Sequence, residues 1–188
     1  MVMFLGEAEV RKLLDWKPLI AAMEAALTAF STGRVIQPVR NMLTIEEGKR
    51  YLGIMPAVAD DAMGLKLVCF YPGNAGTSLP THTAMILLFR PETGEPLAVL
   101  DGRLITEMRT AAVSAAVTNR LAALDSRVLA LLGSGVQARA HLEAIREVRP
   151  IREVRVWSQP LRTPKASRTL MARSQRMPKA RCGTRILS

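Results

Sequence analysis

A strand followed at once by a glycine turn and a helix constrains the fold of this chain more than any other feature. Arg127–Leu132 is a short, nearly all-apolar run, which is typical of a strand buried on both faces. Gly133-Ser134-Gly135 follows directly, and Val136–Val148 has helical spacing. A second strand at Ile151–Trp157 completes the pattern. This succession predicts the opening β-α-β unit of a doubly wound nucleotide-binding domain.

The turn itself has the form G-x-G-x-x-A. The first glycine permits the tight turn, the second lets the backbone approach a pyrophosphate, and the alanine lets the helix pack against the strand. The N-terminus of the helix favours an anion. The cofactor-binding residues predicted from the turn are Gly133 and Gly135. A plain glycine turn with no ligand is the alternative.

The end of the second strand bears on the identity of the cofactor. An acidic residue at this point would bind the ribose hydroxyls of NAD. Here the strand ends at Trp157, and Ser158, Gln159 and Pro160 follow. A serine followed by basic residues favours NADP, so both NAD and NADP stay open.

The residues before the turn predict a mixed α/β unit. Residues 7–33 have helical spacing in two pieces, with Pro18 in a first turn and Gly33 as the stop. A second helix is expected at Ile105–Leu124. Between these helices the expected strands are Val35–Leu43, Tyr51–Val58, Gly64–Tyr71, Thr83–Phe89 and Glu95–Leu100.

Three cations lie in or beside apolar segments of this unit. They are Arg40, Lys66 and Arg109. If they converged they would form a carboxylate site, in which arginine offers bidentate pairing. Spacing alone favours the other interpretation, exposed cations on amphipathic elements. Thr81 and His82 stand at the start of an expected strand, where a lone histidine is more often structural than catalytic.

The basic residues are unevenly distributed. Residues 1–157 hold 18 of the 26 Lys and Arg residues and all 16 Asp and Glu residues. Residues 158–188 hold the other 8 cations and no acid. Such a tail attracts phosphate nonspecifically, but it has no aromatic residue for stacking on bases, so no specific nucleic-acid partner is expected.

Composition also bears on the compartment. The longest uncharged stretch lies between Lys66 and Arg90, and prolines and glycines interrupt it, so no membrane span is predicted. Cys69 and Cys182 form no spacing motif. We therefore expect a cytoplasmic, reduced protein without a metal site.

Several strings taken together resemble the ornithine cyclodeaminase/mu-crystallin family over residues 4–157. The strings are Gln37-Pro38-Val39-Arg40, Tyr51-Leu52-Gly53-Ile54-Met55-Pro56, Leu65-Lys66-Leu67-Val68, Met108-Arg109-Thr110-Ala111-Ala112-Val113-Ser114-Ala115 and Leu131-Leu132-Gly133-Ser134-Gly135-Val136-Gln137-Ala138. The resemblance implies a substrate-binding and dimerisation domain with an inserted Rossmann domain. It also implies a homodimer.

The resemblance assigns roles that spacing does not. It implies that Arg40, Lys66 and Arg109 bind the substrate carboxylate and that Lys66 has a catalytic role in proton handling. It implies cofactor contacts at a second set of positions, namely Thr81, His82, Arg109, Val136, Gln137 and Ala138. With the resemblance, the favoured interpretation of Arg40, Lys66 and Arg109 is no longer exposed surface cations. They are expected to bind a small amino or imino acid.

The resemblance divides the chain into three parts. Residues 1–124 are expected to form the substrate-binding and dimerisation domain, and residues 125–157 the start of the Rossmann domain. Residues 158–188 are expected to be a basic, disordered tail outside the family pattern. Three origins of this tail stay open: an out-of-frame reading of the family segment, an alternative exon and a deliberately basic tail.

Family members continue well beyond this point, so a truncated chain of weak or absent activity is expected. The implied function is NAD(P)-dependent oxidation, reduction or deamination of small amino or imino acids, which leaves cyclodeaminase, ketimine reductase and amino-acid dehydrogenase open. The alternative is a non-catalytic module of the mu-crystallin type that binds a small ligand or dimerises.

Overall fold

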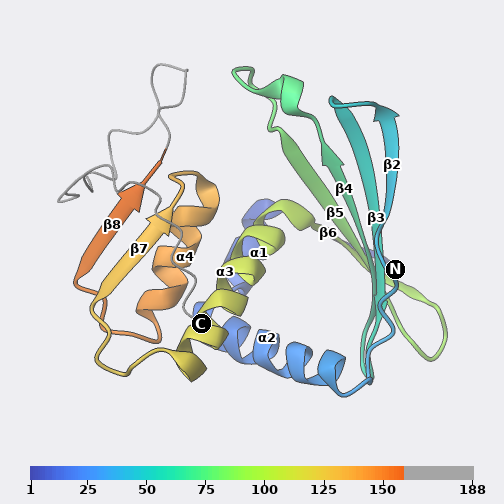
Figure 1. The fold of residues 1–188 in the computed structure, drawn as a ribbon. Helices are drawn as coiled ribbons and strands as arrows, with labels where there is room; N and C mark the ends of the chain where they lie inside the picture. The colour runs from blue at the N-terminus through green and yellow to red at the C-terminus, as the bar shows by residue number, and fades with distance from the viewer. Residues whose placement is uncertain (159–188) are drawn as a thin grey trace, which may run out of the picture.

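The computed structural model describes residues 1–158 and contains two sheets joined through packed helices (Figure 1). Its elements in chain order are β1 (Met3–Leu5), α1 (Glu7–Leu13), α2 (Trp16–Ser31), β2 (Asn41–Glu46), β3 (Arg50–Val58), β4 (Met63–Phe70), the 3-10 helix η1 (Pro72–Asn74), β5 (His82–Phe89), β6 (Pro96–Asp101), α3 (Gly102–Leu121), β7 (Val128–Leu132), α4 (Val136–Arg146) and β8 (Glu153–Trp157). This order confirms the predicted mixed α/β class.

The larger sheet has six strands in the order β1-β6-β5-β4-β3-β2. Strands β2 to β6 pair antiparallel with their sequence neighbours, as successive hairpins do. The short β1 pairs parallel with β6 and was not predicted from the sequence. In the centre of the sheet, Lys66 on β4 lies opposite Met55 on β3 and Ile86 on β5.

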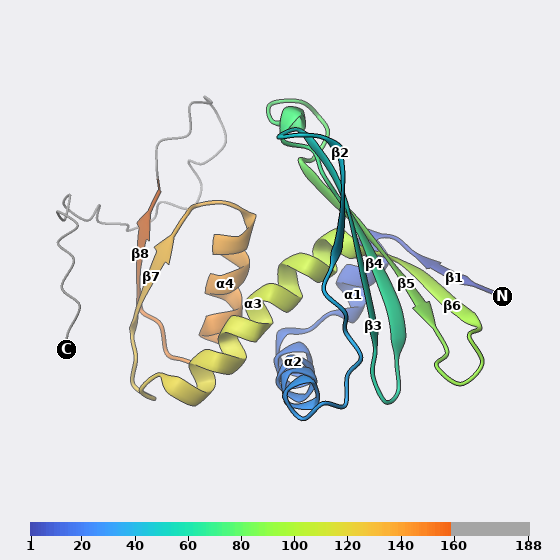
Figure 2. The same cartoon turned by 45° about the vertical axis from the view of Figure 1, so that its right-hand side comes forward.

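Helices α1, α2 and α3 all lie on one side of this sheet (Figures 1 and 2). The contact is closest at Gly102, where an added Cβ would lie 2.9 Å from both the carbonyl carbon and the Cβ of Ala84. Ala84 therefore belongs to the helix-covered face, and strand alternation places Lys66 and His82 on the same face. We call this the inner face and the opposite side the outer face.

The smaller sheet consists of β7 and β8, which run parallel and are connected through α4. This is the predicted β-α-β unit. Helix α4 packs against α3 through small side chains, so α3 touches both the large sheet and the β-α-β unit. Within residues 1–158 no helix combines the length and the apolar character needed to cross a membrane.

One expected strand differs from the structure. The strand expected at Val35–Leu43 begins only at Asn41, and before it Ile36 makes a single bridge to Val58. Pro38 lacks the N–H group that a continuous ladder needs, which accounts for the break.

The prediction of disorder beyond Ser158 lies outside the described residues.

The composition of β7 is typical of a strand buried on both faces, but a strand with one neighbour is expected to expose its apolar side chains. The side chains of β7 alternate between exposed and half-buried, and Leu132 is 84% exposed. Within the described residues β7 has one neighbouring strand, and α4 covers only one of its faces. An apolar strand therefore presents its second face to solvent in this part of the chain.

Candidate functional site

The glycine turn adopts the geometry that its sequence predicts. Gly133 has a φ of 113°, a conformation that residues with a side chain rarely adopt. Its N–H donates to the carbonyl oxygen of Trp157 at 2.7 Å, which ties the turn to the end of β8. The chain then reaches Gly135, which is extended and precedes the first residue of α4.

The start of α4 presents backbone donors to open space. Val136 and Gln137 occupy the first turn, where N–H groups have no partner within the helix. Ala138 donates its N–H to the Gly135 carbonyl oxygen at 3.0 Å. A Cβ added at Gly135 would meet nothing within 4 Å. A depression of about 310 Å³ adjoins the turn, and His141 contributes to its lining.

The three cations singled out in the sequence act on one another electrostatically. Burial lowers the pKa of the Lys66 ammonium, and the positive charges of Arg109 and Arg40 lower it further. Burial and the charge of Arg40 also lower the pKa of the Arg109 guanidinium. Arg109 as a whole residue stays partly exposed to solvent. The Lys66 ammonium is therefore subject to the positive charges of two arginines that are far from it in the sequence.

No carboxylate neutralises this cluster among residues 1–158, where every ion pair involves other cations. Like charges held near one another disfavour the protonated forms, and an anion bound among them would relieve the repulsion. A carboxylate suits such a site because arginine and lysine both donate hydrogen bonds to it.

Thr81 and His82 lie beside this cluster at the beginning of β5. The Thr81 carbonyl oxygen accepts the N–H of Tyr71 at 2.8 Å, which closes the β4–β5 connection. Burial lowers the pKa of His82, and the charge of Lys66 adds to the effect. His82 therefore lies within electrostatic reach of the cations, and the neutral imidazole is favoured there.

Two further polar contacts were not predicted from the sequence. His141 on α4 contacts Ser114 on α3, and Arg149 is buried against the C-terminal end of α3. The residues of each pair are 27 to 30 positions apart, so local spacing gives no sign of either contact.

The fold defines a class: a mixed α/β protein that combines a dinucleotide-type glycine turn with a separate six-stranded sheet that carries Lys66. The sequence model of the ornithine cyclodeaminase/mu-crystallin family matches residues 1–180. The chain belongs to this family. The match extends beyond residue 157, where the resemblance recognised in the sequence ended.

Individual relatives and solved structures agree with this membership. The ketimine reductase mu-crystallin of Mus musculus is 46% identical over 161 residues, covering 82% of this chain and 51% of the relative. The Δ1-pyrroline-2-carboxylate reductase of Thermococcus litoralis, solved with NADH and L-proline, superposes with a TM-score of 0.79 at 36% identity, covering 85% of this chain and 50% of the other. An archaeal alanine dehydrogenase dimer with bound NAD has the same TM-score and identity, covering 84% of this chain and 48% of the other. The chain therefore spans about half the length of these proteins.

Proposed function

We propose that this chain carries the carboxylate-binding and pyrophosphate-binding parts of an NAD(P)-dependent oxidoreductase or cyclodeaminase that acts on small amino or imino acids. One observation carries the proposal: Lys66 on the inner face is subject to the positive charges of Arg40 and Arg109, and none of the three has a carboxylate partner among the described residues. The solved relative that contains L-proline and NADH supports the same pairing of ligand classes.

The residues of the turn fit a dinucleotide. The open space beside Gly135 leaves room for a pyrophosphate against the backbone, and the free N–H groups of Val136 and Gln137 would donate to it. The nicotinamide of such a cofactor would exchange a hydride with the substrate. NAD and NADP both fit what the described residues offer.

The proposed roles of the inner-face residues follow from their chemistry. Arg40 and Arg109 pair with the substrate carboxylate, and Arg109 also reaches towards the cofactor. Lys66 binds the same carboxylate, and its lowered pKa suits it to exchange a proton with the substrate. Thr81 and His82 contact the cofactor from the start of β5.

We propose the corresponding division of the chain: residues 1–124 for substrate binding and dimerisation, and residues 125–157 for the start of the nucleotide unit. A cytoplasmic location is part of the proposal, and the free thiol of Cys69 is in keeping with a reducing compartment.

A titration with NADH tests the cofactor site. Gly135→Val places side-chain atoms where the pyrophosphate would approach, and its Cβ would meet no protein atom within 4 Å. We expect NADH to bind at least about tenfold more weakly, a loss of about 1.4 kcal/mol, with an unchanged melting temperature. Gly73→Val, at another open turn, is the control. Equal NADH affinity in both variants and the wild type would contradict the proposed site.

Turnover by the 188 residues alone is a separate question. Hydride transfer needs cofactor and imine held in near-attack geometry, and positioning of this kind accounts for about 7–11 kcal/mol of the barrier. The described nucleotide unit has only β7, α4 and β8. We therefore expect no NADH oxidation with cyclic ketimines and no ammonia release from ornithine. Sustained turnover by this chain in either assay would refute the expectation.

A second candidate function, a non-catalytic dimerisation module, has its own supporting observation. The strand register places a continuous set of apolar side chains on the outer face, where Figures 1 and 2 show no helix. The set is Phe4, Leu43, Leu52, Ile54, Leu65, Leu67, Met85, Leu87 and Val99. We propose that a second copy of the chain covers this face, as apolar patches of this kind mark interfaces.

A further inference from the structure

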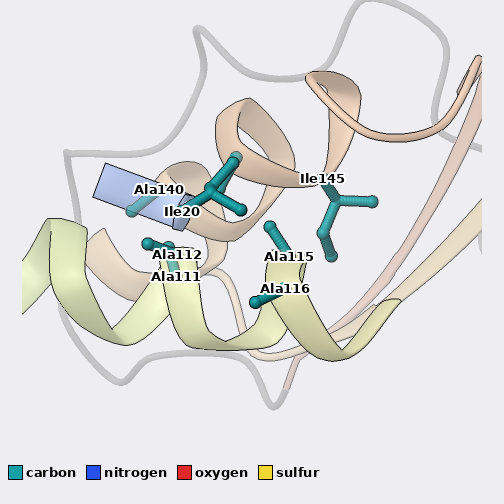
Figure 3. Close-up of a cluster of buried hydrophobic side chains, with 8 residues drawn as sticks. Ile20, Ala111, Ala112, Ala115, Ala116, Ala140 and Ile145 are labelled. Carbon is teal, nitrogen blue, oxygen red and sulfur yellow. The ribbon is translucent and has the colours of Figure 1, made fainter. Parts of the chain in front are cut away.

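The contact between α3 and α4 consists largely of alanines. Ala112, Ala115 and Ala116 on α3 gather with Ala140 and Ala144 on α4 in one buried cluster (Figure 3). Small side chains let two helices approach closely, but they form shallow ridges and grooves. Such a seam supplies burial without strongly selecting one relative placement of the helices.

A first polar contact lies at the end of the seam near the glycine turn. His141 Nδ1 is 2.7 Å from the carbonyl oxygen of Gln137, and His141 Nε2 is 3.0 Å from Ser114 Oγ. A carbonyl oxygen only accepts, so Nδ1 carries the proton and Nε2 accepts the Ser114 hydroxyl. The imidazole thereby joins the first turn of α4 to the middle of α3.

A second polar contact lies at the opposite end. Arg149 is only 4% exposed, and its Nη2 donates to the carbonyl oxygens of Asn119 at 2.9 Å and Ala122 at 2.8 Å. Its Nη1 donates to the Asn119 side chain at 2.9 Å and to the Val148 carbonyl oxygen at 2.6 Å. Among the described residues no carboxylate pairs with it, so the carbonyl end of α3 is what stabilises its charge.

These two contacts lie at different points along α3. Ser114 and Asn119 are five residues apart, which is about 8 Å at the normal rise of an α-helix. Each is directional, so a slide or rotation of α4 on α3 would break both. The consequence reaches the site because Arg109 lies on α3, five positions before Ser114, and the glycine turn leads directly into α4.

We propose that His141 and Arg149 are positioning residues that fix the register of α4 on α3, and so hold the glycine turn at a set distance from Arg109 and Lys66. Neither residue needs to touch a ligand to do this. The placement of α4 on α3 does not depend on the proposed function. Only the expected effect of that placement on ligand binding rests on the proposed function.

The register can be measured as a distance between two spin labels. One label replaces the exposed Glu92 in the β5–β6 turn and the other the exposed Arg139 on α4, in a chain whose Cys69 and Cys182 are changed to serine. An excess of unlabelled chain removes signals between copies. Ser114→Ala and Arg149→Met each remove one contact, Arg149→Lys keeps the charge but loses the planar fork, and Arg146→Met is an exposed control on the same helix.

The wild type and Arg146→Met should give one narrow distance. Ser114→Ala with Arg149→Met should give a broadened distribution with a second population displaced by about 5–6 Å, the spacing of neighbouring side chains on a helix face. Arg149→Lys should lie between them. If the double variant unfolds by circular dichroism, the single variants carry the test. A narrow, unshifted distance in every folded variant would overturn the proposal.

Ligand binding separates this proposal from the function itself. NADH is titrated with and without L-proline, and the gain in affinity that L-proline confers measures the coupling of the two sites. We expect a gain of about fivefold or more in the wild type, falling to about onefold in Arg149→Met while NADH alone binds equally well. A wild type that binds no NADH would refute the proposed function and leave the distance test standing. An undiminished gain in Arg149→Met would refute the positioning role.

Discussion

Lys66 carries its positive charge where burial and two arginines both oppose it. Burial is the larger cause of its lowered pKa, and the charges of Arg109 and Arg40 add to it. The folded protein therefore holds a proton on Lys66 less readily than the unfolded chain does. A residue that reduces stability in the folded state is typical of a functional site, where strain of this kind is kept for binding.

The pH dependence of stability tests this interpretation. Because the folded-state pKa is lowered, the penalty is full below that value and disappears as the pH rises towards the ordinary 10.5. Lys66→Met removes the charge and keeps an unbranched side chain. We expect the variant to be more stable by roughly 1 kcal/mol at neutral pH, with the advantage shrinking in alkaline solution.

Denaturant titrations across this pH range measure the difference. Lys12→Met, at an exposed position on α1, is the control and should leave stability almost unchanged at every pH. A Lys66→Met variant less stable than the wild type at neutral pH would show that the ammonium is satisfied within the fold, contrary to the proposed anion site.

Among the secondary-structure elements, α3 connects the six-stranded sheet to the β7–α4–β8 unit. Its N-terminus rests on the inner face, and the Asp101 side chain caps it by accepting the N–H of Leu104 at 3.0 Å. Its middle carries Arg109, and its second half packs on α4. A shift of this helix would therefore move Arg109 and the nucleotide unit together, relative to Lys66 on the sheet.

Gly102 sets how closely α3 approaches the sheet. A Cβ at this position would lie 2.9 Å from the backbone and Cβ of Ala84, which no rotamer change can relieve. We expect Gly102→Ala to lower the free energy of unfolding by about 1–3 kcal/mol, measured by denaturant titration. Gly73→Ala, with nothing within 4 Å, should change it by less than about 0.5 kcal/mol. Equal effects of the two substitutions would contradict the close contact.

At the scale of the whole molecule, the two faces of the large sheet differ. The inner face is covered by helices and carries Lys66, whereas the outer face is apolar and carries no helix in the described chain (Figures 1 and 2). Met85, near its centre, is 50% exposed. Burial of this surface against a second copy would stabilise both chains.

A single charge placed on the outer face tests the dimer. Met85→Glu remains solvated in a lone chain but would bury a carboxylate in the proposed interface, at a cost of several kcal/mol. We expect sedimentation to give a dimer for the wild type and a single chain of 20.6 kDa for the variant. Ala21→Glu, at an exposed position on α2, should remain dimeric. A wild type that is monomeric at all concentrations would rule out this interface.

The sequence by itself determined the features that depend on neighbouring residues. The β7–turn–α4–β8 succession was predicted correctly because an apolar run, a glycine at positive φ and a helical period are all local. The hairpins β3 to β6 followed for the same reason. The break at Pro38 was not predicted. The apolar composition of Val35–Leu43 favoured a strand, and the N–H group that Pro38 lacks was given too little weight.

Tertiary structure alone decided how distant residues combine. Spacing favoured exposed cations at positions 40, 66 and 109, and only the family resemblance suggested a shared role. In the fold the charges of Arg109 and Arg40 act on Lys66, because β4 lies near the centre of the sheet and α3, which carries Arg109, packs against the same sheet. The contacts of His141 and Arg149 had no sequence signal at all, since each joins helices whose register depends on packing. A hydrogen bond across 27 or 30 residues exists only once the chain has folded.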